Sequence, residues 1–317
     1  MIASPRVAAI VLNWNDAACT TRCLEALLAQ SPPPLIILCD NGSCDDSLPA
    51  LRAWLENQNL HVRECGDSHL PEHAPQAAAY LVRNKQNLGY AAGNNPGIRL
   101  ALSLGLEFVW ILNNDARPLD GALSALLACA EQNPEAGIFG STMVEGVPPR
   151  QKIKVAGGCQ YHPLTTITTP VHAGRAIEDL AELPDRVPTY IHGACLFARA
   201  ALFRNIGVLN EIFFLFYEEL DLCARARAAG YELLWCRTAL VEHLDGHTVK
   251  SAPKAHIEYH ENLSTVLYTR LHHPYLLFPA LAFRLAAKLV FLSLRGHPAR
   301  MSTVWRAYRD GLRRPLR

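Results

Sequence analysis

The chain has 317 residues, of which 50% are hydrophobic and 19% are charged, and its formal net charge is +1 at pH 7. This length is enough for one large or two modest domains with a buried core, and the balanced charge argues against disorder and against a nucleic-acid partner. The 10 cysteines include no Cys-x-x-Cys pair, so neither a zinc site nor a disulfide framework is indicated. We therefore expect reduced thiols and a cytoplasmic protein.

Alternating strands and helices are predicted for the first half of the chain, where short apolar runs alternate with segments of helical periodicity. The predicted strands are residues 7–12, 35–39, 80–83, 108–112 and 137–141. The predicted helices are residues 17–30, 48–59 and 119–132, and a loop rich in glycine and asparagine at 87–97 leads into another helix that ends near residue 104. A strand, helix, strand order implies right-handed parallel crossovers. Residues 65–79 are predicted to form an exposed excursion.

The second half is less regular between residues 143 and 188, where loops and short antiparallel strands are expected. Regular structure is predicted again at 190–199, in a short helix around residue 202, and in a helix that follows the acidic cluster near residue 219 and stops at Gly230. Two strands, 232–235 and 239–242, are predicted before His243.

The C-terminal part is strongly basic, with nine arginines and one lysine from Arg270 onward against one acid, Asp310. Its apolar run at 276–294 is interrupted by Pro279, Arg284 and Lys288, which argues against a membrane span and leaves a surface-lying amphipathic helix open. Peripheral docking on the anionic inner membrane face would explain the basic tail. An ordinary solvated helical cap explains it nearly as well.

A polar tip ends the most apolar predicted strand, where Asn113, Asn114 and Asp115 follow Leu112. Ligands of open α/β sheets lie at the carboxyl ends of the strands. An Asn-x-Asp pair offers one neutral and one charged oxygen, which suits a hard divalent cation that carries a diphosphate. The alternative is a turn that merely ends the strand.

An acidic cluster, Glu218, Glu219 and Asp221, begins a predicted helix. The helix dipole alone accounts for acids in a first turn. It does not account for the four aromatic residues that lead into the cluster, Phe213, Phe214, Phe216 and Tyr217. An apolar wall excludes water and raises the pKa of a carboxyl group, as a general base requires.

Two groups of histidines remain. His243 ends a predicted strand near the acidic helix, so its imidazole is a candidate ligand for a metal at Asp115, although a lone histidine is usually structural. His256 and His260 flank Glu258, but the spacing differs from the zincin motif, so we expect a solvated helix face. The chain has neither a dinucleotide fingerprint nor a P-loop motif.

These motifs, taken in order, resemble the family 2 glycosyltransferases of GT-A fold, and among them the rhamnosyltransferase and galactofuranosyltransferase-like group. The resemblance covers roughly residues 7–248. It is carried by Val-Leu-Asn-Trp-Asn at 11–15, Asp-Asn-Gly-Ser at 40–43, the 87–97 loop, Asn-Asn-Asp at 113–115, Gly-Ala-Cys-Leu at 193–196, Tyr-Glu-Glu-Leu-Asp-Leu-Cys at 217–223, and His243.

The resemblance implies an α/β fold, the Rossmann-like GT-A nucleotide-sugar-binding fold, with a central, mostly parallel sheet and a helical C-terminal tail. It implies a GT-A domain at residues 1–250, with a nucleotide-binding half at 1–118 and an acceptor-binding half at 119–250. Residues 251–317 would form a basic amphipathic helical extension.

Site roles follow from the same resemblance, position by position. Nucleotide-sugar contacts are expected from Asn13, Trp14, Asp40, Asn87, Gly89, Asn95, Asn113 and Asn114. Asp115 is expected to bind Mn²⁺ or Mg²⁺ with help from Asn113 and His243, and the histidine favours Mn²⁺. The catalytic group would be Glu219 as the base, with Glu218 and Asp221. The acceptor side would comprise His192, Gly193, Ala194 and Tyr217, with a weak diphosphate contact from His247.

Three positions depart from the family pattern. Asn113 stands where relatives have aspartate, so the metal site carries less charge. Glu219 stands where many have aspartate, which moves the base by about 1.5 Å, one carbon–carbon bond. Glu261 stands where relatives often have arginine before Asn262, so a donor phosphate contact there is in doubt.

The function implied is inverting, metal-dependent transfer of a sugar from a nucleoside diphosphate donor, with dTDP-rhamnose as the leading donor and a UDP-sugar as the alternative. The acceptor is expected to be a polysaccharide or a polyprenyl-linked oligosaccharide. A catalytically inactive protein of the same fold that binds a nucleotide sugar or glycan is the other alternative.

Overall fold

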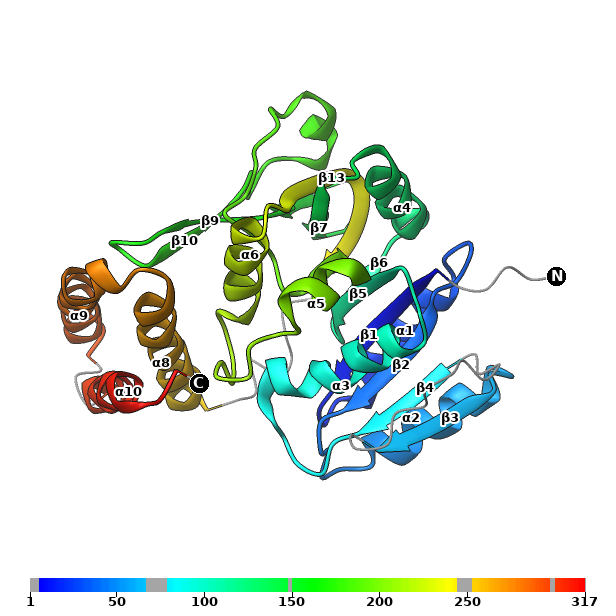
Figure 1. Ribbon diagram of the computed structural model, residues 1–317, viewed down its shortest axis with the longest axis horizontal. Helices are drawn as coiled ribbons and strands as arrows, with labels where there is room; N and C mark the ends of the chain where they lie inside the picture. The colour runs from blue at the N-terminus through cyan, green and yellow to red at the C-terminus, as the bar shows by residue number, and fades with distance from the viewer. Residues whose placement is uncertain (1–5, 67–78, 148–149, 244–252, 297–299, 317) are drawn as a thin grey trace.

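The computed structural model describes residues 6–66, 79–147, 150–243, 253–296 and 300–316. It contains a ten-stranded mixed sheet, a small three-stranded sheet, and a group of helices at the C-terminal end. In Figure 1 the C-terminal helices α8, α9 and α10 lie at the opposite end of the molecule from the N-terminus.

The large sheet has the strand order β3-β4-β2-β1-β5-β12-β7-β13-β6, and β8 pairs with β7. The bounds are β1 Val7–Asn13, β2 Leu35–Asp40, β3 Val62–Gly66, β4 Ala79–Arg83, β5 Phe108–Asn113, β6 Ala116–Pro118, β7 Ala136–Glu145, β8 Lys152–Ala156, β12 Cys195–Arg199 and β13 Glu232–His243. The first five strands in this order are parallel, whereas β12 runs antiparallel to both β5 and β7. The predicted central, mostly parallel sheet is thus confirmed.

The register aligns the polar ends of the central strands. In β1, Asn13 lies opposite Asp40 of β2, and Leu12 lies opposite Asn113 of β5. Because the apolar parts of β1, β2 and β5 are buried, the chain turns polar only where these strands end. The sheet therefore presents its polar tips along one edge, where parallel sheets hold ligands.

The helices that follow the strands are α1 Ala17–Leu28, α2 Ser47–Asn57, α3 Gly89–Ser103, α4 Ala122–Gln132, α5 Ala200–Ile206 and α6 Glu218–Ala228, with a short 3₁₀ helix at Ile177–Glu182. Helix α3 packs closely on β1 and β2. A Cβ atom at Gly97 would lie 2.8 Å from the sulfur of Cys39 and 2.9 Å from Ile10 Cγ2. Only glycine allows this approach of helix and sheet.

A long hairpin links the sheet to the C-terminal helices. The small sheet has the order β10-β9-β11, with β9 at Gly158–His162, β10 at Ile167–Pro170 and β11 at Tyr190–Ile191. In Figure 1 the β9–β10 hairpin reaches from the large sheet toward α8 and α9. Its tip residue, Thr166, is 3% exposed, so it is covered by another part of the molecule.

The C-terminal helices are α8 Lys254–His272, α9 Leu277–Leu294 and α10 Met301–Arg313, with a 3₁₀ turn at Pro274–Leu276. Leu263, Leu267 and Tyr268 of α8 belong to the same hydrophobic core as the large sheet. A second, smaller cluster joins Val266 of α8 to Leu281 of α9, among others. Helix α8 therefore connects the outer helices to the main core.

Three expectations are corrected. The helix predicted at 119–132 begins at Ala122, after Gly121, whose φ is 77°. The two strands predicted at 232–235 and 239–242 are one strand, β13, with a register irregularity between them. The expected solvated face around Glu258 is wrong, because this carboxylate is 4% exposed and pairs with Arg300 at 2.8 Å.

Candidate active site

Strand pairing brings Asp115 and His243 together. The antiparallel pairing of β13 with β6 sets His243 opposite Ala116, the residue after Asp115. The Nε2 atom of His243 lies 3.2 Å from Asp115 Oδ1, and the Asp115 carboxylate is 4% exposed. The two residues are 128 positions apart, 243 − 115, so the sheet topology alone unites them.

Buried polar atoms without hydrogen-bond partners gather at this tip. They include Asn113 Oδ1, Asp115 Oδ2 and His243 Nδ1, while Asp115 Oδ1 and His243 Nε2 face only each other, at 3.2 Å and without a hydrogen bond. Buried polar atoms are normally hydrogen-bonded, so unpartnered ones indicate a missing ligand. Oxygen donors with one imidazole fit Mn²⁺ or Mg²⁺.

The part of the chain that the structure describes holds no group of three or more His, Cys, Asp or Glu side chains placed to bind a metal ion. The set at the strand tip is smaller, with one carboxylate, one imidazole and one amide oxygen. Cations that keep water or substrate oxygens need only one or two protein carboxylates. These residues therefore fit a divalent cation that has further oxygen ligands from outside the protein.

A second buried histidine adjoins the first. The rings of His192 and His243 are 6.1 Å apart between centroids. Burial, followed by the neighbouring His243, lowers the pKa of His192 to about 4. Its Nδ1 atom accepts a hydrogen bond from the backbone of Ala194 at 3.2 Å. His192 is thus a neutral imidazole at pH 7.

Glu218 and Glu219 begin α6 in an apolar setting. Each has one carboxylate oxygen that is buried without a hydrogen-bond partner. Burial raises the pKa of Glu219 to about 7. Burial and the adjacent Glu219 charge raise the pKa of Glu218 well above its ordinary value. A carboxylate that is desolvated and has a free oxygen is suited to accept a proton near neutral pH.

Tyr90 connects the acidic pair with the strand tip. Its hydroxyl donates to the carbonyl of Gly193 at 2.9 Å. Its pKa is raised well above the ordinary value by burial and then by the charges of Glu218, Glu219 and Asp115. The charges of all three carboxylates therefore act on one hydroxyl group.

Gly193 lies directly against the candidate base. A Cβ atom at Gly193 would be 3.4 Å from the carboxyl carbon of Glu219. The next residue, Ala194, accepts a backbone hydrogen bond from Asn113 at 3.0 Å. The short segment 193–194 thus separates the acidic pair from the strand tip and contacts both.

The predicted residues at the ends of β1 and β2 form one hydrogen-bonded group. Asn13 donates to Asp40 Oδ1 at 3.0 Å, and the hydroxyl of Ser43 donates to the same oxygen at 2.6 Å. The hydroxyl of Thr20 donates to Asn13 at 2.7 Å and accepts from Asn114 at 3.2 Å. Trp14, the residue after Asn13, is only half-buried.

Asn87 and Asn95 of the 87–97 loop form hydrogen bonds with backbone groups. Asn87 accepts from the N–H of Gly89 at 2.9 Å and so ties down the start of α3. Asn95 is 0% exposed, donates to the carbonyl of Leu209 at 2.9 Å and accepts from its N–H at 3.1 Å. Both side chains fix loops beside the site, and Asn95 itself is sealed from solvent.

The predicted catalytic residue Asp221 is engaged elsewhere. The Asp221 carboxylate is held by Arg225 at 2.7 Å and by His272 of α8 at 2.8 Å. It is therefore engaged on the side of α6 that faces the C-terminal helices. His247 lies outside the described residues.

Sequence reasoning missed Tyr90, Thr20 and Ser43. Signals for two of them were present, because Tyr90 follows Gly89 in the glycine-rich loop and Ser43 ends the Asp-Asn-Gly-Ser segment. Thr20 lies in a helix with no motif around it. Only the folded sheet reveals that it links Asn13 to Asn114.

The mixed α/β sheet is the fold of GT-A glycosyltransferases. Residues 8–203 match the family described as glycosyl transferase family 2. The chain belongs to this family, and the protein is a glycosyltransferase that transfers a sugar.

Several characterised relatives are about a quarter identical. The N-acetylglucosaminyl-diphospho-decaprenol L-rhamnosyltransferase of Mycobacterium tuberculosis is 26% identical over 83% of this chain and 84% of its own length. Galactofuranosyltransferase GlfT1 of Mycolicibacterium smegmatis is 26% identical over 86% of this chain and 82% of its own. The low-salt glycan biosynthesis hexosyltransferase Agl10 of Haloferax volcanii is 26% identical, over 65% of this chain but only 58% of its own length.

Solved structures share the GT-A fold. The mannosyltransferase PcManGT from Pyrobaculum calidifontis, in complex with GDP-Man and Mn²⁺, has a TM-score of 0.54 at 15% identity and covers 98% of this chain and 88% of its own. TarS 1–349 of S. aureus, in complex with UDP-GlcNAc, has a TM-score of 0.56 at 14% identity and covers 97% and 80%.

The contact between the 87–97 loop and the turn before α6 yields a test. Gly89 has φ +82°, and a Cβ atom there would lie 2.2 Å from the carbonyl oxygen of Phe214. We expect Gly89→Ala to lower the free energy of unfolding by about 3 kcal/mol, because overpacking adds to the left-handed backbone cost.

Gly105→Ala is the matched control, since Gly105 has φ +73° and nothing within 4 Å of the added Cβ. It should lower the free energy of unfolding by only about 1 kcal/mol. Denaturant titration of both variants and of the wild-type protein measures the two losses. Equal losses for the two variants would show that the loop and the turn are not in tight contact.

Proposed function

We propose that the protein is an inverting, metal-dependent glycosyltransferase that moves rhamnose from dTDP-rhamnose to a polysaccharide or a polyprenyl-linked oligosaccharide. One observation carries the proposal: a buried oxygen of Glu219 has no hydrogen-bond partner and lies beside Gly193, and the segment 193–194 separates it from the pair of Asp115 and His243. The rhamnosyltransferase relative supports the sugar, and its name specifies a diphospho-decaprenol acceptor.

In this proposal the strand tip holds the donor. Asp115, with Asn113 and His243, would hold a divalent cation, which would neutralise charge on the departing diphosphate. Asp40 would accept the imide N–H of thymine or uracil, because its Oδ2 atom accepts only the N–H of Ser43 within the described chain. Trp14 would stack near the base, and Gly89, Asn87 and Asn95 would shape the wall of the donor site.

The acceptor side comprises His192, Gly193, Ala194 and Tyr217. Glu219 would take the proton from the acceptor hydroxyl as that oxygen attacks the anomeric carbon from the face opposite the diphosphate. The raised pKa of Glu219, about 7, matches a base that works near neutral pH. Glu218 and Glu219 influence each other's ionisation, because two adjacent desolvated carboxylates do not both ionise easily.

Replacement of the base separates chemistry from donor binding. Glu219→Gln should lower the transfer rate at least about 1000-fold, because general-base catalysis contributes up to about 10⁴-fold. Calorimetric titration of dTDP and UDP, with Mn²⁺ and with excess chelator, should give metal-dependent binding that the substitution leaves within about twofold.

A full transfer rate in the variant contradicts the assignment of Glu219. Tighter binding of UDP than of dTDP points to the UDP-sugar alternative, and no binding of either nucleotide to folded wild-type protein favours the inactive alternative.

The pH profile tests the same residue in the unmodified enzyme. The reactive form of Glu219 is the carboxylate, so the rate should be highest above the raised pKa of about 7. Below that pH the rate should fall about tenfold per pH unit, because the protonated fraction grows in that proportion. Initial rates between pH 5 and pH 9, with nucleotide affinity measured in parallel, check this. A flat rate down to pH 5 would exclude a base with a raised pKa.

Helix α9 supports a peripheral membrane contact. Within the described residues one stretch, Pro274–Leu294, is long and apolar enough to cross a membrane by length and composition, and only 22% of its apolar window is buried. Its inner side is bound to the protein, because Arg284 is 8% exposed and hydrogen-bonded to α8. Its outer side exposes Tyr275, Phe278, Phe283, Leu289, Val290, Phe291 and Leu294.

We infer that this outer face lies on an anionic bilayer surface rather than crossing the membrane. The face is apolar, and exposed arginines of the same region, Arg295, Arg306, Arg309 and Arg313, provide the charge that attracts anionic lipids. A helix with a buried, hydrogen-bonded arginine on one side cannot leave the protein without breaking those bonds. An acceptor on a polyprenyl lipid would meet the enzyme at this surface.

Vesicle binding tests the membrane contact. The double variant Phe278→Ser, Leu294→Ser removes side chains that are 78% and 84% exposed, so folding should be unaffected. Binding to phosphatidylglycerol vesicles should weaken at least about tenfold, because each buried apolar side chain contributes about 2 kcal/mol. Val187→Ser, at a position 64% exposed and far from α9 in the sequence, is the control and should bind as wild type. Unchanged binding of the double variant would rule out this face.

A further inference from the structure

The turn before α6 has an unfavourable backbone conformation. Phe216 and Tyr217 are consecutive non-glycine residues with φ values of 66° and 73°. Left-handed conformations cost such residues about 1 kcal/mol or more each and persist only where surrounding contacts impose them. Glu218 and Glu219 follow immediately, so the direction of the candidate base depends on whatever holds this turn.

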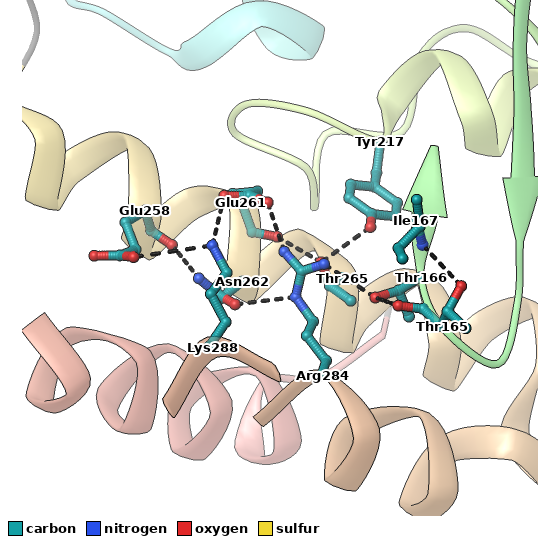
Figure 2. Close-up of polar contacts among 10 residues, drawn as sticks. All are labelled: Thr165, Thr166, Ile167, Tyr217, Glu258, Glu261, Asn262, Thr265, Arg284 and Lys288. Atoms are coloured by element: carbon teal, nitrogen blue, oxygen red, sulfur yellow. Dashed lines mark hydrogen bonds and ion pairs between the residues drawn. The ribbon is translucent and has the colours of Figure 1, made fainter. Parts of the chain in front are cut away.

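Helix α8 holds the turn from the C-terminal side. The hydroxyl of Ser264 donates to the carbonyl of Leu215 at 2.9 Å, and the hydroxyls of Thr265 and Tyr217 are hydrogen-bonded at 3.0 Å. Ser264 is 1% exposed and Thr265 is 0% exposed, so water does not compete for these bonds. Figure 2 shows the Tyr217 hydroxyl directed at Thr265.

Arg284 of α9 in turn fixes α8. Its guanidinium group donates to Asn262 at 3.1 Å, to Glu261 at 2.6 Å and to Thr166 at the tip of the β9–β10 hairpin at 3.0 Å. Figure 2 shows the guanidinium between α8 and the hairpin. Glu261, where the family resemblance implies an arginine, thus accepts a hydrogen bond from an arginine of another helix.

A threonine hydroxyl inside a helix commonly bonds to the carbonyl one turn earlier. Thr265 and Thr269 of α8 both do so, at 2.7 Å and 2.8 Å. Thr265 differs because its hydroxyl also contacts the turn that presents the base, whereas the hydroxyl of Thr269 faces the side chain of Tyr161 in β9. Helix packing alone does not require that contact.

We propose that Thr265 and Ser264 are positioning residues that act through the 215–217 turn to aim Glu219 at the acceptor hydroxyl. The inference rests on the proposed role of Glu219 as base. Displacement of a catalytic group by a fraction of an ångström slows the chemical step and leaves the binding of a separate donor intact. The C-terminal helices are then part of the catalytic apparatus.

The test compares Thr265→Val with Thr269→Val. Both substitutions remove a hydroxyl from a threonine that is 0% exposed in the same helix, and both should reduce thermal stability similarly. Thr265→Val should lower kcat about tenfold with the donor KM within twofold, whereas Thr269→Val should keep kcat within twofold.

Tyr217→Phe removes the other hydroxyl, and the double variant with Thr265→Val should be no slower than the slower single variant. Equal kcat for the two threonine variants, or multiplicative losses in the double variant, would overturn the proposal.

A second measurement needs no substrate. Amide hydrogen exchange of the segment 213–220 should be faster in Thr265→Val than in Thr269→Val, because only the first loses a contact to the turn. Equal exchange in the two variants means that α8 does not hold the turn. If wild-type protein transfers no sugar, the proposed function fails, and the exchange result still decides whether α8 holds the turn.

Discussion

The desolvated carboxylates that act on Tyr90 are the constraint on which the site depends. Asp115, Glu218 and Glu219 each have a buried oxygen without a hydrogen-bond partner, and their charges all raise the pKa of Tyr90. No arginine or lysine in the described part of the chain is paired with either glutamate. Removing an ionised carboxylate from water without a partner costs several kcal/mol. The protein responds in two ways, because Glu218 and Glu219 have raised pKa values and Asp115 faces an imidazole. A cation and a diphosphate at the strand tip would complete this electrostatic arrangement.

The parallel part of the sheet and the strand tip were predictable from sequence because their signals are local. An apolar run that ends in Asn113, Asn114 and Asp115 defines both a strand and its functional end. The pairing of Asp115 with His243 was expected from the family resemblance, and β6, the three-residue strand that produces the pairing, was missed. A three-residue strand is too short to show the alternating pattern by which strands are predicted from sequence.

The helical C-terminal region shows what sequence cannot supply. Glu258 lies between two histidines near the start of a helix, and this pattern predicts a solvated helix face. Its carboxylate is instead buried and paired with Arg300 and Lys288. Basic residues that look like a uniformly charged tail divide into buried ones, such as Arg284, and exposed ones, such as Arg309. Which arginine turns inward depends on packing between helices, and composition does not encode that choice. Thr265 is likewise indistinguishable from Thr269 until the turn of Tyr217 lies beside it.

Helix α8 links the two surfaces that this enzyme would use. Its inner residues Leu263 and Leu267 join the core of the large sheet, and its polar residues bond to the turn before α6 and to Arg284 of α9. A Cβ atom at Gly311 of α10 would lie 2.8 Å from Val266, so α10 packs on α8 without space between them. Helix α9 is attached to α8 by the hydrogen bonds of Arg284 and by the contact cluster of Val266 and Leu281. An enzyme that drew its acceptor from a bilayer through α9 would have its base-bearing turn attached to the same helix, which would hold the base at a fixed position relative to the membrane surface.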